Sequence, residues 1–154
     1  MTLEEQIVKK LQEKGYTITT AESCTGGLLA GRILNVSGAS EVYMEGYITY
    51  ANEAKERILG VKHETLETYG AVSKETAEEM AVGAARAAKA DVALSTTGIA
   101  GPGGGTVEKP VGLIYISCFL NGEVQVRELR LHGTREENRQ DTVTETLKLL
   151  NDIL

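Results

Sequence analysis

The sequence has no tryptophan and a single phenylalanine among its 154 residues. Such a chain offers no aromatic platform on which the bases of a single-stranded nucleic acid could stack. It also contains no pronounced run of lysine and arginine, and its formal net charge is −6. Non-specific binding to nucleic acid requires a basic face, so we expect no nucleic-acid partner. A local basic pocket for one phosphate group is still compatible with this composition.

Metal and disulfide frameworks are also missing from the sequence. The two cysteines, Cys24 and Cys118, have no metal-ligand spacing, and a chain of this size does not require a disulfide scaffold. His63 and His132 are isolated, and neither lies in a His-Glu-x-x-His arrangement. We therefore expect no dedicated metal site.

Long apolar runs are absent as well. No segment approaches the ~20 apolar residues of a membrane span. The first ten residues have the pattern of an amphipathic helix and lack the uninterrupted apolar run of a secretion signal. We expect a cytoplasmic protein with no membrane partner, and the length fits one domain over 1–154.

The patterns that are present alternate between helix and strand. Helices are expected over 3–14, 26–36, 53–59, 74–89 and from Thr134 onward, with a short helix or a turn over 63–69. Strands are expected over 17–22, 42–50, 91–97, 111–120 and 123–131. Asn52 is a candidate cap for the short third helix, Glu137 completes a capping box with Thr134, and Asn121-Gly122 is a hairpin turn signal. This order predicts an α/β fold, a three-layer α/β/α sandwich. Its mixed, mostly parallel sheet is expected to contain one antiparallel strand.

The most informative segment is Ala21-Glu22-Ser23-Cys24-Thr25-Gly26-Gly27, between an expected strand and an expected helix. A turn of small residues there exposes a hydroxyl and places free backbone N–H groups at a helix N-terminus. That geometry suits a nucleophile with donors beside it for an oxyanion or a phosphate. The alternative is that Ser23 or Thr25 only caps the helix and the glycines only close the turn.

Two further loops follow expected strands, Tyr50 to Lys55 and Gly98 to Gly105. Ligands of open α/β sheets bind beyond the carboxyl ends of the strands, so one shared site is expected there. A lysine beside a serine can act as a general base if its pKa is lowered, and the hydroxyl of Tyr50 can relay a proton or hold that lysine. The alternative for Lys55 is an ordinary exposed lysine among charged neighbours.

The glycine-rich loop matches neither the phosphate-loop nor the dinucleotide pattern. Its glycines nevertheless allow a ligand to approach the backbone closely, and its amide groups can form an anion nest. The alternative is a merely flexible loop. Arg135 and Arg139 lie one turn apart near the start of the last helix, where they could bind a phosphate, contact a second subunit or simply be solvated.

Five motifs together resemble the C-terminal domain of the competence/damage-inducible protein CinA, a family that includes nicotinamide mononucleotide deamidases (PncC). The resemblance extends over nearly the whole chain. The motifs are Ala21 to Gly27, Tyr47-x-x-Tyr50-x-Asn52-x-x-Lys55, Gly70-Ala71-Val72-Ser73, Thr97 to Gly104 and Lys109-Pro110-Val111-Gly112.

The resemblance implies an amidohydrolase that converts nicotinamide mononucleotide to nicotinate mononucleotide and ammonia, in pyridine nucleotide recycling. The family's nucleophile, tyrosine and lysine map to Ser23, Tyr50 and Lys55, and no metal or organic cofactor is implied. Family analogy also implies a homo-oligomer. Full-length CinA has an N-terminal domain that resembles molybdopterin-binding proteins and carries pyrophosphatase activity. The present chain begins at the deamidase-like domain, so we expect that second activity to be absent.

The expected mechanism is attack by Ser23 on the carboxamide carbon, with neutral Lys55 accepting the serine proton and Tyr50 relaying or orienting it. Backbone N–H groups near Thr25, Gly26 and Gly27 would hold the oxyanion. Residues expected to bind the substrate are Thr25, Gly26, Gly27, Asn52, Gly98, Ala100, Gly101, Gly103 and Gly104. Two alternatives remain open: a non-catalytic nucleotide-binding or assembly module that keeps the pocket, and an amidase for a related amide such as free nicotinamide.

Overall fold

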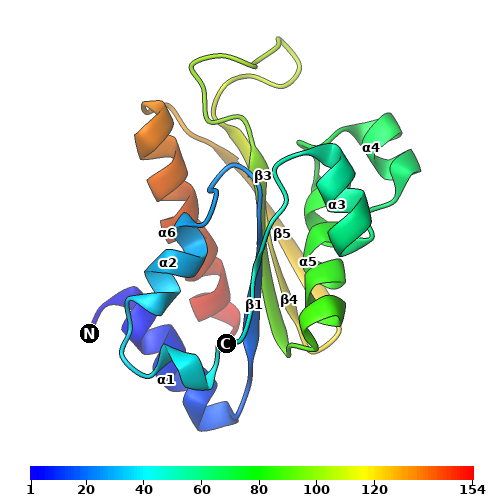
Figure 1. The fold of residues 1–154 in the computed structure, drawn as a ribbon. Coiled ribbons are helices and arrows are strands. Elements are labelled where there is room, and N and C mark those ends of the chain that lie inside the picture. The colour runs from blue at the N-terminus through cyan, green and yellow to red at the C-terminus, as the bar shows by residue number, and fades with distance from the viewer.

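A five-stranded sheet lies between two layers of helices in the computed structural model, which describes residues 1–154 (Figure 1). The strand order is β2-β1-β3-β4-β5. β1 pairs in parallel with β2 and β3, while β4 runs antiparallel to both β3 and β5. The strands are β1 (Ile18–Glu22), β2 (Tyr47–Ile48), β3 (Val92–Gly98), β4 (Leu113–Leu120) and β5 (Glu123–Arg130). The expected three-layer sandwich with a single strand of opposite direction, β4, is therefore confirmed.

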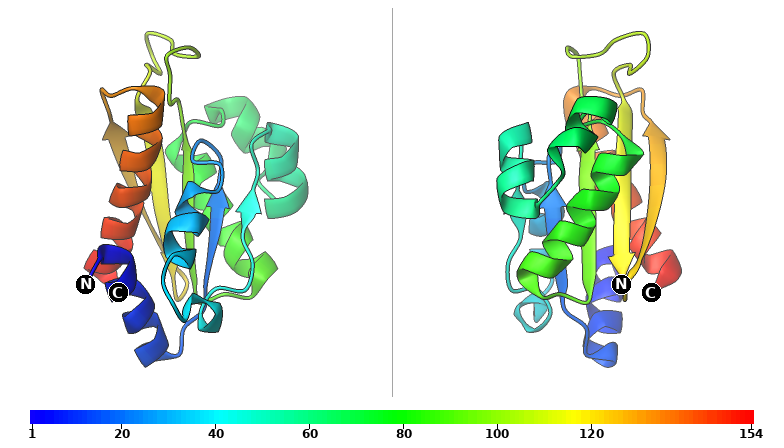
Figure 2. Two further views of the ribbon diagram at one scale, coloured as in Figure 1. Left: turned by 60° about the vertical axis from the view of Figure 1, so that its left-hand side comes forward. Right: turned by 90° about the vertical axis from the view of Figure 1, so that its right-hand side faces the viewer.

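The helices divide between the two faces of the sheet, as the two views of Figure 2 show. One face carries α1 (Leu3–Lys14), α2 (Leu28–Leu34) and α6 (Arg135–Ile153), whose apolar side chains form the larger core cluster with the sheet. The other face carries α5 (Lys74–Ala88), against which α3 (Asn52–Leu59) and α4 (His63–Tyr69) pack. None of these helices combines the length and the apolar character that a membrane span needs.

The helix starts follow from local capping chemistry. Thr134 and Glu137 form the expected capping box on α6, and the Ser73 hydroxyl accepts the N–H of Thr76 at the start of α5. The Asn121-Gly122 turn joins β4 to β5 with positive φ at both residues. The expected cap at Asn52 is wrong, because Asn52 is already the first residue of α3 and no side chain caps that helix.

The expected strand over 42–50 is much shorter in the structure: only Tyr47–Ile48 form β2, and Tyr43 makes an isolated bridge with Ile18. A short 3-10 helix (Ala39–Glu41) precedes this segment. The Thr19 hydroxyl donates to the Glu45 carbonyl at 2.7 Å, and the Thr20 hydroxyl bonds the Tyr43 hydroxyl at 2.8 Å. Side chains of β1 therefore hold residues that strand propensity alone would have placed in the ladder.

Gly83 lies at a close helix contact, where α5 meets the end of α3. A Cβ at this position would overlap the Leu59 carbonyl oxygen, a backbone atom that cannot move aside. We expect Gly83→Ala to destabilise the protein by about 1–3 kcal/mol in urea unfolding, despite the better helix propensity of alanine. Gly31→Ala in α2 is the matched control, because no atom lies within 4 Å of its Cβ. That control should gain about 0.5–1 kcal/mol, and equal gains in both variants would contradict the proposed clash.

Candidate active site

The turn between β1 and α2 presents Ser23 at the carboxyl end of a strand. The Ser23 N–H donates to the Thr96 carbonyl of the neighbouring strand β3 at 3.0 Å, which fixes the residue at the sheet edge. Gly26 and Gly27 both adopt positive φ, so the chain reverses into α2 within a few residues. Ser23 is buried, and 8% of the residue's surface stays accessible to solvent.

The fully buried carboxylate of Glu22 organises this turn from within. It accepts the Thr25 hydroxyl at 2.5 Å and the N–H groups of Gly27, Leu29 and Ala30 at 2.9–3.2 Å. The first N–H groups of α2 therefore bind the protein's own anion and are not open to a phosphate. Glu22 was named in the sequence analysis only as part of the segment Ala21 to Gly27. An acidic residue that ends a strand just before a turn into a helix is a signal that could have revealed this role.

The N–H groups of Gly26 and Gly27 are already occupied in the structure. Gly26 N–H donates to the Ser23 carbonyl at 3.2 Å and Gly27 N–H to Glu22, so the expectation that both serve an incoming oxyanion is wrong. No hydrogen bond within the chain uses the N–H of Cys24 or of Thr25. These two groups directly follow Ser23 in sequence and are the donors that the turn leaves available.

Lys55 comes from α3 and meets Ser23 at the same edge of the sheet. Its Nζ lies 3.1 Å from Ser23 Oγ, 2.9 Å from the Thr49 carbonyl oxygen and 3.1 Å from that of Tyr50. The residue is only 1% exposed and takes part in no ion pair. Burial lowers the pKa of Lys55 to about 8, because a cation loses its hydration there.

The partners of Lys55 also determine what its neutral form can do. A neutral amine has two hydrogens and one lone pair. The carbonyls of Thr49 and Tyr50 can only accept, so they take the two hydrogens and leave the lone pair for the hydroxyl of Ser23. The site can thus move the serine proton to Lys55, which is the requirement for an activated serine nucleophile.

Tyr50 contributes differently from the expectation. Its side chain is 66% exposed, and its hydroxyl accepts a hydrogen bond from Arg135 at 3.4 Å. No hydrogen bond joins this hydroxyl to Ser23 or Lys55, and only the Tyr50 backbone carbonyl contacts the lysine. A direct relay through the phenol is therefore not formed in this arrangement.

A pocket of about 210 Å³ lies beside the nucleophile turn and is lined by all five of the expected glycine-loop residues. Its lining is Cys24, Tyr50, Gly98, Ile99, Ala100, Gly101, Gly103, Gly104 and Arg135. Four expected binding residues lie outside this lining: Thr25, Gly26, Gly27 and Asn52. Asn52 is exposed outside this lining, and the Thr25 hydroxyl is occupied by Glu22 and by the Thr96 hydroxyl.

The beginning of α6 connects the glycine loop to the nucleophile turn. Arg135 donates to the Gly101 carbonyl at 2.9 Å, and buried Asn138 donates to the Ala100 carbonyl at 3.0 Å. Arg139 reaches the turn itself, with Nε 2.9 Å from the Cys24 carbonyl oxygen and Nη2 3.1 Å from that of Thr25. The two arginines are therefore not simply a solvated helix face. Sequence analysis missed Asn138, whose position one turn after Thr134 gave no separate signal.

Cys24 is a poor alternative nucleophile in this setting. Its thiol is buried, and burial raises its pKa to about 11, so the reactive thiolate is scarce at neutral pH. Cys24 and Cys118 are both free thiols, and no group of three or more histidine, cysteine or acidic side chains is placed to hold a metal ion.

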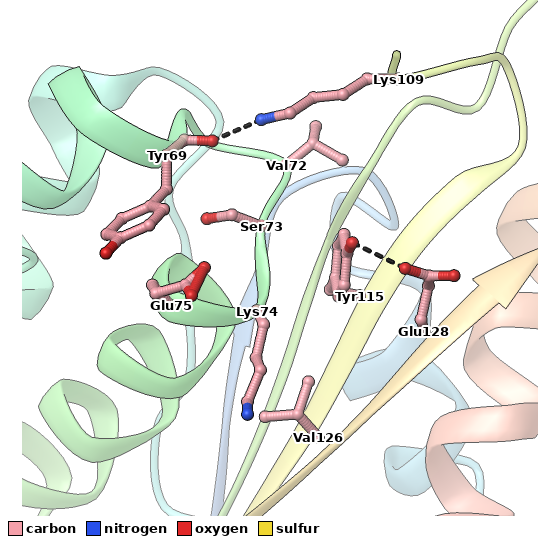
Figure 3. Close-up of a pocket in the computed structure, with 9 residues that line it drawn as sticks. All are labelled: Tyr69, Val72, Ser73, Lys74, Glu75, Lys109, Tyr115, Val126 and Glu128. Atoms are coloured by element: carbon pink, nitrogen blue, oxygen red, sulfur yellow. Dashed lines mark hydrogen bonds between the residues drawn. The ribbon is translucent and has the colours of Figure 1, made fainter.

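The largest cavity, of about 530 Å³, is a separate feature near the start of α5 (Figure 3). It is lined by Tyr69, Val72, Ser73, Lys74, Glu75, Lys109, Tyr115, Val126 and Glu128. Ser23 and Lys55 line neither this cavity nor the smaller pocket, but only the smaller pocket includes Cys24 of the nucleophile turn. The Lys109 ammonium donates to the Tyr69 carbonyl here, and Thr97 donates to the Ala71 carbonyl at 2.8 Å. The motif 70–73 thus anchors the residue before the glycine loop, and Lys109 of the motif 109–112 anchors the end of the loop.

Comparisons with known proteins agree with the resemblance noted in the sequence. The family model described as CinA C-terminal domain matches residues 1–154. A CinA-like protein of Kosmotoga olearia is 58% identical over 138 residues, which are 90% of this chain and 34% of that protein. The chain spans about a third of the length of the curated relatives it matches.

Two solved structures share the fold throughout. The competence/damage inducible protein CihA from Agrobacterium tumefaciens is 45% identical, with a TM-score of 0.95 over 97% of this chain and 92% of its own. A CinA superfamily protein from Escherichia coli is 34% identical, with a TM-score of 0.96 over 99% of this chain and 88% of its own. These names describe a family and not a reaction.

Proposed function

The chain belongs to the CinA C-terminal domain family, and we propose that it is an amidohydrolase that converts nicotinamide mononucleotide to nicotinate mononucleotide and ammonia. One observation carries the reaction type. A buried lysine without an acidic partner lies 3.1 Å from a serine hydroxyl, and two carbonyls orient its amine. The substrate comes from the family resemblance, and the pocket beside the serine supports it.

The first half of the reaction forms an acyl-enzyme. Ser23 Oγ attacks the carboxamide carbon while neutral Lys55 accepts the hydroxyl proton. The carbonyl oxygen becomes an oxyanion, which the free N–H groups of Cys24 and Thr25 stabilise. Lys55 then returns its proton to the amide nitrogen, the C–N bond breaks, and ammonia leaves with the nicotinoyl group esterified to Ser23.

The second half repeats the same proton movements with water. Lys55, neutral again, takes a proton from a water molecule that attacks the ester carbon. The C–O bond to Ser23 breaks, Ser23 Oγ recovers its proton, and nicotinate mononucleotide leaves. The roles of base and acid alternate on one amine, which a group with a pKa of about 8 can perform near neutral pH.

The glycine loop supports binding of the ribose phosphate. Gly98, Gly101, Gly103 and Gly104 line the pocket with backbone atoms, and Arg135 adds a positive charge at its rim. Backbone amides and one guanidinium are groups that bind phosphate in many proteins. Because the Glu22 carboxylate occupies the start of α2, the phosphate is better accommodated at this loop than at the helix N-terminus.

The direct test is ammonia release from nicotinamide mononucleotide, with the nucleotide product identified by chromatography. We expect stoichiometric release, a lower kcat/KM for nicotinamide riboside and a still lower value for free nicotinamide, since each lacks part of the bound group. Binding of the mononucleotide without release would instead favour the non-catalytic module. Preference for free nicotinamide would point to a different amidase.

A further inference from the structure

Arg139 binds the backbone of the nucleophile turn and forms no ion pair. Its Nε and Nη2 contact the carbonyl oxygens of Cys24 and Thr25, although 115 and 114 positions of sequence separate them. No carboxylate lies within ion-pair distance of this guanidinium. The side chain is half-buried, and its hydrogen bonds go to these two carbonyl groups.

The first of these contacts has a consequence on the other side of the same peptide unit. The Cys24 carbonyl and the Thr25 N–H belong to one planar trans peptide, in which the two groups point in opposite directions. A cation that holds the carbonyl therefore fixes the direction of the N–H. It also polarises the amide, which makes its N–H a stronger hydrogen-bond donor.

Gly26 fits this arrangement. Its φ is +54°, and a Cβ at this position would lie 3.1 Å from Arg139 Nη2. A side chain here would both strain the backbone and press on the guanidinium. From the opposite side, Glu22 binds the Thr25 hydroxyl and the next N–H groups of α2. Thr25 is thus held by a cation at the backbone carbonyls of Cys24 and Thr25 and by an anion at its side-chain hydroxyl.

We propose that Arg139 is a positioning residue that aligns and strengthens the Thr25 N–H as an oxyanion donor. This inference rests on the proposed amidohydrolase function. In this role Arg139 stabilises the transition state through the Thr25 N–H. In a phosphate-binding role it would instead contact the phosphate group of the substrate. Removal of a transition-state interaction lowers kcat, whereas removal of a phosphate contact raises KM.

The kinetic test compares Arg139→Ala and Arg139→Lys with wild type on nicotinamide mononucleotide and on nicotinamide riboside, which lacks the phosphate. We expect kcat to fall on the order of 10- to 100-fold in Arg139→Ala, equally for both substrates, with KM changed less than threefold. Added guanidinium ion should restore part of the kcat of Arg139→Ala. Arg139→Lys, which keeps the charge but not the fork, should lie between the two. Arg127→Ala, which removes an exposed arginine on β5, is the control and should match wild type.

Two outcomes would overturn the inference. A loss confined to the phosphate-bearing substrate and expressed in KM would identify a phosphate ligand. An unchanged kcat in a folded Arg139→Ala or Arg139→Lys would exclude any role in alignment.

A second readout does not depend on the nucleotide. A fluorophosphonate esterifies an activated serine with loss of fluoride, and its phosphoryl oxygen then occupies the oxyanion position. Labelling of Ser23, followed by mass spectrometry, should slow in Arg139→Ala by a factor similar to the loss in kcat. Labelled wild type that releases no ammonia from the nucleotide would refute the proposed substrate while leaving this test valid. Labelling of Arg139→Ala at the wild-type rate would refute the role of Arg139.

Discussion

Ser23→Ala is expected to reduce ammonia release from nicotinamide mononucleotide by about 10³-fold or more. The change removes the atom that bonds to the carboxamide carbon, and Lys55 has no other hydroxyl among its hydrogen-bond partners. The hydroxyl is small and accepts only one hydrogen bond in the structure, so the fold should be retained. Ammonia release and the thermal unfolding midpoint, measured on the same preparation, separate loss of chemistry from loss of structure.

Cys24→Ala is the matched control for the nucleophile. The two residues are adjacent, both are buried, and the raised pKa of the Cys24 thiol keeps it protonated. We expect this variant to retain turnover within about tenfold, since the Cys24 backbone N–H survives the substitution. A Ser23→Ala enzyme with a near-normal rate, paired with an inactive Cys24→Ala enzyme, would move the nucleophile to the cysteine.

Lys55→Met is expected to lower kcat/KM on the order of 10²- to 10⁴-fold, the usual contribution of a positioned base. The wild-type enzyme should also gain activity as the pH rises through about 8. Below that value the amine of Lys55 is protonated and cannot take the serine proton, and above it the amine is neutral. The variant should lose this ascending limb. A pH profile of kcat/KM for both proteins measures the two effects together.

The same shift has a stability counterpart that does not require turnover. Folding lowers the pKa of Lys55 from 10.5 to about 8, so between these values the unfolded chain binds more protons than the folded one. The free energy of unfolding should therefore rise with pH across this window relative to Lys55→Met.

Lys55→Arg, which stays charged at every accessible pH, should be as inactive as Lys55→Met. An ascending limb that persists in either variant would assign the titration to another group.

Much of the fold was predictable because its signals are local. Apolar spacing defined α1 and α5, Thr134 with Glu137 defined the start of α6, and the Asn121-Gly122 turn defined the hairpin. The segment over 42–50 could not be predicted in this way. Its conformation depends on hydroxyl groups of β1, which lie more than twenty positions away.

The candidate site was predictable in part for a topological reason. Ser23 and Lys55 follow adjacent parallel strands, and the carboxyl ends of such strands share one sheet edge. The direction of the Tyr50 phenol and the reach of Arg139 depend on how α6 packs, which no local pattern records. The occupied N–H groups of Gly26 and Gly27 likewise became apparent only once the Glu22 side chain had been placed.

The glycine loop has a base that is held by hydrogen bonds and a tip that is exposed. Its base is fixed by Arg135 and Asn138 on one side and by Lys109 on the other, while residues 102–108 extend from the sheet with exposed side chains. Gly101 is locked, since its φ is +85° and a Cβ would strike Val111, but a Cβ at Gly103 meets no atom within 4 Å. A single substitution at 103 can therefore reshape the pocket without disturbing Ser23 or Lys55. Position 103 is therefore where we expect ligand selectivity to be adjustable by substitution while Ser23 and Lys55 stay in place.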